Sequence, residues 1–499
     1  MTDRSPARTR VVIAGGGTAG WCAAAALSKQ LGALIDITLV ESDEIGTVGV
    51  GEATIPTVRS FHTLCGIDER EFMAATQATF KLGIAFENWA QPGDRYLHSF
   101  GVVGKSTWMA DFQHIWLEAR RQGIAGPIGD YCFEHQAADA EKFYVSDAAK
   151  ISYAFHLDAT AYARFLRSIS ERQGVRRVEG RIARVEQHGE TGDIAALHLE
   201  NGTMIAGDLF IDCTGFRSLL LGQTLGVPYV DWSEWLPMNA AQAVQTEAVR
   251  PAVPYTRAIA HDAGWRWQIP LQTRVGNGLV YSTDYLSDDA ARDRLLGAIE
   301  GRPLTDPRQL RFTTGRRARL WERNVVAMGL SSGFLEPLES TSIHLMMIAV
   351  TRLIQMFPFG TGSHQALADR FNAISIAELE GVRDFIILHY AATQRDDSPF
   401  WQRCRSMTLP DSLRARMTLW RESAQAFQAG EDIFRVDSWI QVMLGQRVEP
   451  QDWHAVARMI PPPRLAESLR DLKQQIDRAV GQMPHHADFV AGYCPARAA

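Results

Sequence analysis

The sequence predicts an α/β protein of the doubly wound type, joined to a sheet-containing segment and a mostly helical C-terminal part. Three observations favour this fold. The apolar residues 11–14 precede a glycine-rich turn and then a stretch of helix-forming residues. Two further apolar runs, at 208–213 and 325–328, lead into small residues, as buried parallel strands often do. From about residue 361 onward, the apolar residues recur mostly at helical spacing.

Composition excludes several classes of protein. The chain has 499 residues, of which 46% are apolar and 22% charged, and its net charge is −6. These values describe an ordinary globular protein and give no reason to expect a nucleic-acid or membrane partner. No apolar run approaches the roughly 18 residues of a membrane span. The six cysteines lack metal-ligand spacing, so we expect no metal site and a cytoplasmic protein with reduced thiols.

The glycine-rich turn is the first functional signal. Gly15, Gly17 and Gly20 form a G-x-G-x-x-G pattern between a strand and a helix, and the next strand, at 36–40, ends at Glu41. The first glycine permits a tight turn, the second allows a pyrophosphate to approach, and the third lets helix and strand pack closely. The helix N-terminus attracts phosphate, and the acid can bind ribose hydroxyls. We therefore expect dinucleotide binding here, with Thr18 and Ala19 contributing. The alternatives are an unrelated glycine turn or, because arginines at 4, 8 and 10 precede it, a secretory signal.

Two later segments favour FAD over a nicotinamide cofactor. The strand at 208–212 ends in Asp212-x-Thr-Gly215, and the strand at 325–328 runs into Gly329. Both resemble the returning strands of flavoprotein hydroxylases, although many of those enzymes carry an aspartate where Gly329 stands. The chain contains one complete G-x-G-x-x-G pattern, so a second tightly bound nucleotide is not indicated.

A tryptophan pair makes the resemblance more specific. Residues 264–270 read Gly-Trp-Arg-Trp-Gln-Ile-Pro, and on a strand Trp265 and Trp267 would face the same side. This matches the GWxWxIP signature of flavin-dependent halogenases, the family that acts on tryptophan and other indoles. In that family the pair would wall off the flavin from the organic substrate. Taken alone, the two residues could also be core tryptophans beside a turn.

Other segments resemble the same family, and together they cover about residues 11–400. They are GGGxAGW at 15–21, VGVGEATxP at 48–56, FxEPLEST at 334–341 and the stretch 383–390. The second segment implies a loop beside the flavin, with Val48, Gly49, Gly51 and Glu52 as contacts.

The resemblance implies that Lys81 and Glu339 are the catalytic pair. Lys81 has apolar neighbours, and a lysine there is costly to bury unless it is paired or used. Without the resemblance, a surface lysine with a buried stem would be the better interpretation. Glu339 has a second acid, Glu336, three positions before it, and either could cap a helix beginning near Ser340 or Thr341. The resemblance makes Glu339 the catalytic acid and Glu336 the structural one.

The resemblance also implies substrate and halide contacts. His98 and Phe100 would frame an aromatic substrate, although an ordinary core phenylalanine with a nearby histidine explains them nearly as well. Ser340 would link the flavin and substrate sites. The backbone N–H groups of Thr341 and Ser342 would hold the halide, but relatives usually carry glycine at the second position.

The implied reaction is halogenation of an electron-rich aromatic. FADH2, O2 and chloride or bromide would yield hypohalous acid, which Lys81 positions while Glu339 assists. A separate flavin reductase would supply FADH2, and a homodimer is one open option. An aromatic hydroxylase is the first alternative, and it would consume NADPH without an added reductase. A non-catalytic flavin-binding module is the second.

The expected organisation is discontinuous. We expect the FAD-binding domain at about 1–105, 150–225 and 310–360, with a substrate segment inserted at about 226–309. Residues 361–499 would form the helical subdomain that completes the substrate site, with helices at 413–428 and 465–480 and a break at the prolines 461–463. The sequence leaves the native substrate, the halide and the halogenated carbon open.

Overall fold

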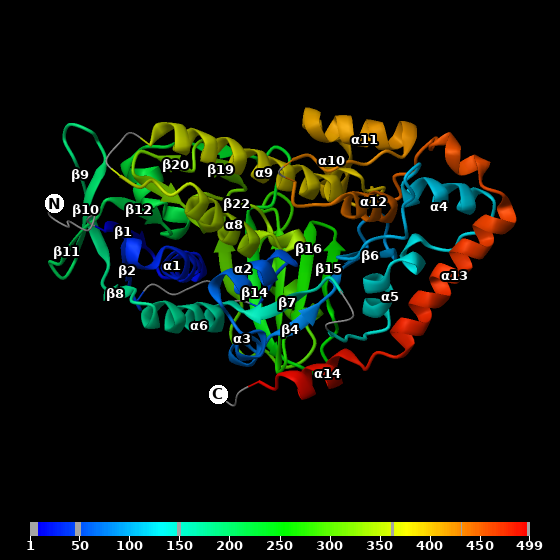
Figure 1. Ribbon diagram of the computed structural model, residues 1–499, viewed down its shortest axis with the longest axis horizontal. Coiled ribbons are helices and arrows are strands. Elements are labelled where there is room, and N and C mark those ends of the chain that lie inside the picture. Colours follow the sequence, from blue (N-terminus) through cyan, green and yellow to red (C-terminus); the bar gives the residue numbers. More distant parts are fainter. Residues whose placement is uncertain (1–7, 45–50, 147–150, 361–363, 431, 497–499) are drawn as a thin grey trace, which may run out of the picture.

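The structure, a computed structural model, describes residues 8–44, 51–146, 151–360, 364–430 and 432–496. One large sheet lies near the middle of the molecule and the other toward its left-hand side (Figure 1). No helix in the described residues combines the length and apolarity needed to span a lipid bilayer.

The first sheet is the predicted doubly wound one. In spatial order its strands are β20 (Trp321–Glu322), β21 (Val325–Ala327), β12 (Leu209–Asp212), β1 (Thr9–Ala14), β2 (Ile35–Glu41) and β8 (Arg176–Glu179). All neighbouring pairs are parallel except β20 with β21. The runs predicted at 11–14, 36–40, 208–212 and 325–328 all form strands of this sheet.

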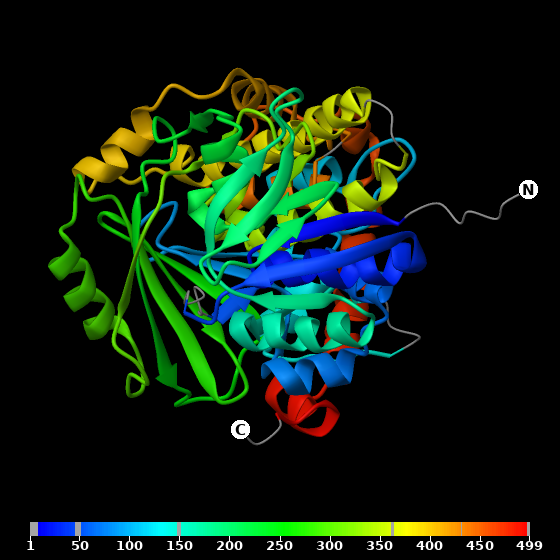
Figure 2. The same cartoon turned by 90° about the vertical axis from the view of Figure 1, so that its left-hand side faces the viewer.

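Both faces of this sheet are covered, which explains why β1 reads as a continuous apolar run. Val11 and Ile13 pack in the same cluster as helix α1 (Thr18–Leu31), whereas Val12 and Ala14 face the small sheet on the other side. Helix α1 packs against α6 (Ala159–Arg172) and α8 (Ser342–Gln355). The small sheet consists of β11 (Met204–Ala206), β10 (Ile194–Leu199) and β9 (Ile182–Gln187) (Figure 2).

The second large sheet is mixed. Its order is β18 (Arg308–Arg311), β14 (Ala240–Glu247), β17 (Arg274–Tyr281), β16 (Gly264–Pro270), β15 (Tyr255–His261), β5 (Gly83–Glu87) and β6 (Arg95–Ser99). Strands β14 to β17 lie in the segment expected to contain a sheet. Strands β5 and β6 come from the first expected FAD-binding stretch. They join this sheet because β5 pairs in parallel with β15. Tertiary pairing therefore joins these two parts of the chain.

A three-stranded sheet lies against the second large sheet. Its order is β3 (Gly51–Ala53), β7 (Ala154–Asp158) and β4 (Thr79–Lys81), and β3 contacts both β16 and β17. The remaining small sheet has the order β13 (Tyr229–Asp231), β19 (Gly315–Arg317) and β22 (Gly333–Phe334).

The C-terminal part is helical, as predicted. Helix α11 (Asp411–Ser423) ends five residues before the predicted 428, because Ala424 adopts a left-handed conformation with φ 55°. Helix α13 (Pro462–Gly481) contains the predicted 465–480 and begins at the proline break. The other C-terminal helices are α9 (Gln365–Ala391), α10 (Pro399–Ser406), α12 (Val436–Gly445) and α14 (His486–Tyr493).

The remaining helices belong to the first three hundred residues. They are α2 (Thr57–Cys65), α3 (Glu69–Thr76), α4 (Phe112–Arg121), α5 (Phe133–Asp139) and α7 (Asp288–Ala298). In Figure 1, α13 follows the right-hand edge of the molecule, and α14 lies at the lower edge close to β4.

Candidate functional site

Lys81 ends strand β4 with its side chain inside the protein. The residue is 0% exposed, and its Nζ donates hydrogen bonds to Ser340 Oγ at 2.7 Å and to the Thr54 carbonyl at 3.1 Å. The same nitrogen lies 5.2 Å from the centre of the Phe100 ring. Burial lowers the pKa of Lys81 to about 7, although the negative charge of Glu339 opposes this shift. The surface-lysine interpretation is therefore wrong.

Glu339 lies in the same buried region and is held by two histidines. It ends a short 3-10 helix, Pro337–Glu339, and only 1% of the residue is exposed. His98 Nδ1 lies 3.0 and 2.9 Å from the two carboxylate oxygens, and His389 Nε2 lies 2.8 Å from Oε1. Burial is the largest single influence and would raise the pKa of Glu339. The two imidazoles together outweigh it, so the pKa falls to about 2.

His389 is a site residue that sequence reasoning missed. It lies near the end of α9, and its Nδ1 is 2.8 Å from the Phe385 carbonyl one helical turn earlier. The stretch 383–390 was noticed for its resemblance, but nothing local indicates that one of its side chains meets Glu339. His98 was expected to frame a substrate, and the structure places it against Glu339 as well.

Glu336 connects the tryptophan pair Trp265 and Trp267, called the tryptophan wall below, to helix α9. Trp265 and Trp267 are both buried on β16, with ring centres 6.0 Å apart. Glu336 Oε2 accepts hydrogen bonds from Trp265 Nε1 at 2.7 Å and from the Tyr390 hydroxyl at 2.6 Å. Burial raises the pKa of Glu336 to about 7. These contacts support the interpretation of Glu336 as the structural acid.

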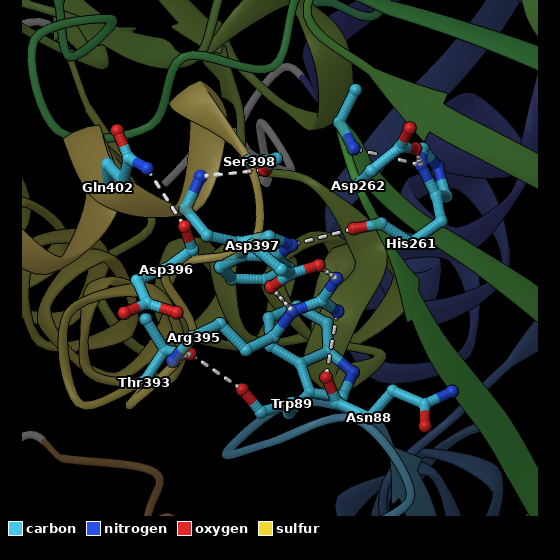
Figure 3. A network of polar contacts seen from close by, with 12 residues as sticks. Asn88, Trp89, His261, Asp262, Thr393, Arg395, Asp396, Asp397, Ser398 and Gln402 are labelled. Carbon is cyan, nitrogen blue, oxygen red and sulfur yellow. Dashed lines mark hydrogen bonds and ion pairs between the residues drawn. The ribbon is translucent and has the colours of Figure 1, made fainter.

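A polar network joins the connection between α9 and α10 to the loop after β5 (Figure 3). The ring of Trp89 lies 6.4 Å from that of Trp265, and the Trp89 carbonyl accepts a hydrogen bond from Thr393 Oγ1 at 2.8 Å. Arg395 forms two hydrogen bonds with Asp397, at 2.8 and 2.7 Å. The connection between α9 and α10 is thereby held against the loop after β5.

The strap after Glu339 leads into a helix N-terminus. Ser340 has a left-handed backbone with φ 59°, and α8 begins at Ser342, slightly later than expected. Thr341 is 1% exposed, and its hydroxyl has no hydrogen-bond partner among the described residues. Because the first N–H groups of a helix have no partner within it, this position combines free donors with a partial positive charge. The arrangement suits a small anion.

The glycine turn before α1 forms a cradle in which Gly15 and Gly20 leave no room for a side chain. Gly15 has φ +109°, and a Cβ there would lie 2.2 Å from the Cys213 carbonyl oxygen. A Cβ on Gly20 would lie 1.9 Å from the Gly15 carbonyl oxygen, whereas Gly17 faces open space. Gly329, with φ +62°, closely approaches Ala19. This backbone therefore fits a pyrophosphate group.

Two acids border the cradle. Glu41 accepts a hydrogen bond from Arg177 Nε at 2.5 Å and another from Trp21 Nε1 at 3.3 Å. Its carboxylate occupies the space where a Cβ on Gly16 would lie.

Asp212 is buried and accepts hydrogen bonds from the main chain of Thr214, Leu220 and Leu221 and from the Thr214 hydroxyl. Its contribution is therefore to shape the turn that carries Gly215, whose φ is +71°.

The segment expected beside the flavin is described only in part. Val48 and Gly49 lie outside the described residues. Gly51 and Glu52 form part of β3, and Glu52 is partly buried. Burial raises the pKa of Glu52 to about 7.

The comparison with protein families decides the assignment. A profile described as tryptophan halogenase matches residues 10–462. The chain belongs to the tryptophan halogenase family. The tryptophan 6-halogenase SttH of Streptomyces toxytricini is 37% identical over 450 residues, covering 84% of this chain and 85% of that protein. The tryptophan 7-halogenase RebH of Lentzea aerocolonigenes is 36% identical, covering 83% and 82%.

Solved structures agree with this assignment. Xcc4156, a flavin-dependent halogenase from Xanthomonas campestris, superimposes with a TM-score of 0.97 at 54% identity and covers 99% of both chains. BrvH, a flavin-dependent halogenase from Brevundimonas sp. BAL3, gives 0.93 at 42% identity and covers 98% of this chain and all of that one. This halogenase is accordingly a flavin-dependent oxidoreductase.

Proposed function

We propose that this halogenase uses FADH2 and O2 to place chloride or bromide on an electron-rich aromatic such as indole or tryptophan. The observation that carries the proposal is the burial of an ammonium and a carboxylate in one site. Lys81 hydrogen-bonds Ser340, and Ser340 directly follows Glu339. Burying two charged groups is costly, and such groups with strongly shifted pKa values are typical of functional sites.

The residues around the glycine turn fit FAD. Gly15, Gly17 and Gly20, with Thr18 and Ala19, would hold its pyrophosphate, and Glu41 would face a ribose. The remaining contacts would come from Gly51, Glu52, Gly215 and Gly329, from the turn shaped by Asp212, and from Val48 and Gly49. When bound, reduced FAD and O2 supply the oxidation that converts halide and a proton into hypohalous acid, with water as the second product.

The segment after Glu339, at the N-terminus of α8, would hold the halide. The backbone N–H groups of Thr341 and Ser342 and the unpartnered Thr341 hydroxyl are available for it. Trp265 and Trp267 would keep the organic substrate away from the flavin.

On the far side of the wall, Lys81 fixes the oxidant, either by a hydrogen bond or as a haloamine. Glu339 stabilises the cationic ring intermediate and assists removal of the ring proton. His98 and Phe100 border the aromatic substrate. The curated relatives SttH and RebH are named tryptophan halogenases, which favours an indole ring as the acceptor.

Two further proposals concern the source of FADH2 and the cellular compartment. A separate flavin reductase supplies FADH2, because the chain carries one complete dinucleotide pattern. The six cysteines are unpaired, which suits a reducing cytoplasm.

The test is a Lys81→Ala variant given reduced FAD, bromide and indole under air. We expect the wild type to yield bromoindole and the variant to lose nearly all of this activity. A Lys105→Ala variant, which removes an exposed lysine, should behave as wild type. Undiminished bromination by Lys81→Ala would remove Lys81 from the mechanism. A hydroxylated product formed with NADPH and no added reductase would favour an aromatic hydroxylase. Repeating the assay with tryptophan and chloride identifies the preferred aromatic substrate and the preferred halide.

A further inference from the structure

The two nitrogens of His98 have different environments. Nδ1 lies 3.0 and 2.9 Å from the oxygens of Glu339, which can only accept hydrogen bonds when ionised. The proton of a neutral His98 must therefore sit on Nδ1. Nε2 then carries a free lone pair, and it has no hydrogen-bond partner among the described residues although the side chain is 3% exposed. A buried imidazole held in this tautomer has the form of a general base.

A second histidine, His389, lies against the same carboxylate. Its Nδ1 lies 2.8 Å from the Phe385 carbonyl, and its Nε2 lies 2.8 Å from Glu339 Oε1 without the geometry of a hydrogen bond. Because the pKa of Glu339 falls to about 2, its carboxylate remains an anion and is a weak proton acceptor on its own.

We propose that His98 is the base that takes the proton from the aromatic ring, with Glu339 and His389 as its positioning residues. The inference rests on the proposed function. The ring carbon attacks the halogen of hypohalous acid, the new carbon–halogen bond forms, and the electron pair of the halogen–oxygen bond leaves on oxygen. That oxygen takes up a proton from the Lys81 ammonium, which holds the oxidant, and departs as water. The ring C–H electron pair then returns to the ring, and its proton passes to His98 Nε2.

The surroundings suit this role. The rings of Phe385 and Phe434 lie 5.6 and 6.4 Å from that of His98, so two aromatic side chains border the imidazole. The titratable groups around the pair are Lys81 from β4, Tyr96 from β6 and His389 from α9. As in a carboxylate–imidazole dyad, Glu339 would stabilise the imidazolium that forms.

The kinetic test compares two histidine variants. His98→Asn keeps an amide N–H near the Nδ1 position for Glu339 but removes Nε2. We expect kcat for halogenation to fall by roughly 100-fold or more, a much larger change than that in KM. A primary isotope effect should appear with ring-deuterated indole, and added imidazole should restore part of the rate. His198→Asn is the matched control, since it removes an imidazole that lies 2.6 Å from Glu186 on the distant β9–β11 sheet. An unchanged kcat in His98→Asn, without an isotope effect, would overturn the role of His98 and leave the proposed function standing.

A second measurement does not depend on turnover. Nitrogen-15 NMR of histidine-labelled full-length protein, assigned with the same variants, reports which ring nitrogens carry protons. At neutral pH we expect a proton on Nδ1 alone for His98. A proton on His98 Nε2 with Nδ1 bare would overturn the proposal. If the wild type halogenated no aromatic compound, the proposed function would fail, and the NMR result would still decide whether His98 can accept a proton.

Discussion

At the scale of single residues, Lys81 shows most clearly that the site lowers the stability of the fold. Its folded-state pKa of about 7 lies below the ordinary value of 10.5, chiefly because burial penalises the ammonium. The negative charge of Glu339 compensates only part of that loss. A residue that destabilises the fold at neutral pH is retained most simply for its chemistry.

The first prediction concerns the pH dependence of stability. Folding lowers the pKa of Lys81, so the unfolded chain binds more protons between about pH 7 and 10.5, and the free energy of unfolding rises with pH across that window. Between pH 7 and 9 this rise should be roughly 2 kcal/mol. In Lys81→Met that contribution should vanish, and the variant should be more stable than wild type below pH 7. Urea unfolding of both proteins at several pH values measures the difference, and parallel curves would refute the buried ammonium.

At the scale of elements, the C-terminal helix α14 supports the strand that carries Lys81. The backbone N–H of Phe80 donates to His486 Nε2 at 3.2 Å, and His486 Nδ1 donates to the Ala252 carbonyl at 2.7 Å. Phe80 also stacks on Phe143 with ring centres 4.0 Å apart, and it lies 5.7 Å from Phe489 of α14. The last helix of the chain thus sets the position of β4.

The second prediction follows from this contact. His486→Ala leaves the buried Phe80 N–H without a partner, which should lower the free energy of unfolding by about 1–3 kcal/mol. Because Phe80 precedes Lys81, kcat should fall as well. His485→Ala, which changes the exposed neighbouring histidine, should alter neither quantity. Thermal unfolding and the bromination assay test this together. Equal melting temperatures for the two variants would show that α14 does not support β4.

At the scale of the whole molecule, the two sheets that form the site meet at a pair of glycines. A Cβ on Gly276 of β17 would lie 3.0 Å from the Gly51 Cα and 3.1 Å from its nitrogen. The neighbouring atoms are backbone, so they cannot rotate away. This contact joins the sheet of Lys81 to the sheet of the tryptophan wall.

The third prediction tests this junction. Gly276→Ala should destabilise the protein by about 1–3 kcal/mol through overpacking, and it should reduce halogenation because it separates β3 from β17. Gly297→Ala is the control, since its position in α7 is open and alanine favours helices, which should stabilise by up to about 1 kcal/mol. Unfolding curves and initial rates for both variants provide the comparison. Wild-type stability in Gly276→Ala would show that the sheets tolerate the extra methyl group.

Much of the architecture could be predicted because its causes are local. The strand, turn and helix of residues 9–31 follow from the apolar period and from glycines that alone fit such a turn. The wall residues Trp265 and Trp267 share one side because side chains on a strand alternate. The end of α11 was missed, because the left-handed conformation of Ala424 has no signature in the sequence.

The sequence by itself determined four strands of the parallel sheet and, through resemblance, the identity of Lys81 and Glu339 as candidates. Only the tertiary structure decided that both are buried together, and that His98 and His389 hold the carboxylate from β6 and α9. The physical reason is the distance along the sequence over which each interaction acts. Hydrophobic periodicity and glycine conformation act within a few residues, whereas the hydrogen bond from Lys81 to Ser340 spans 259 positions and exists only after the sheets have paired.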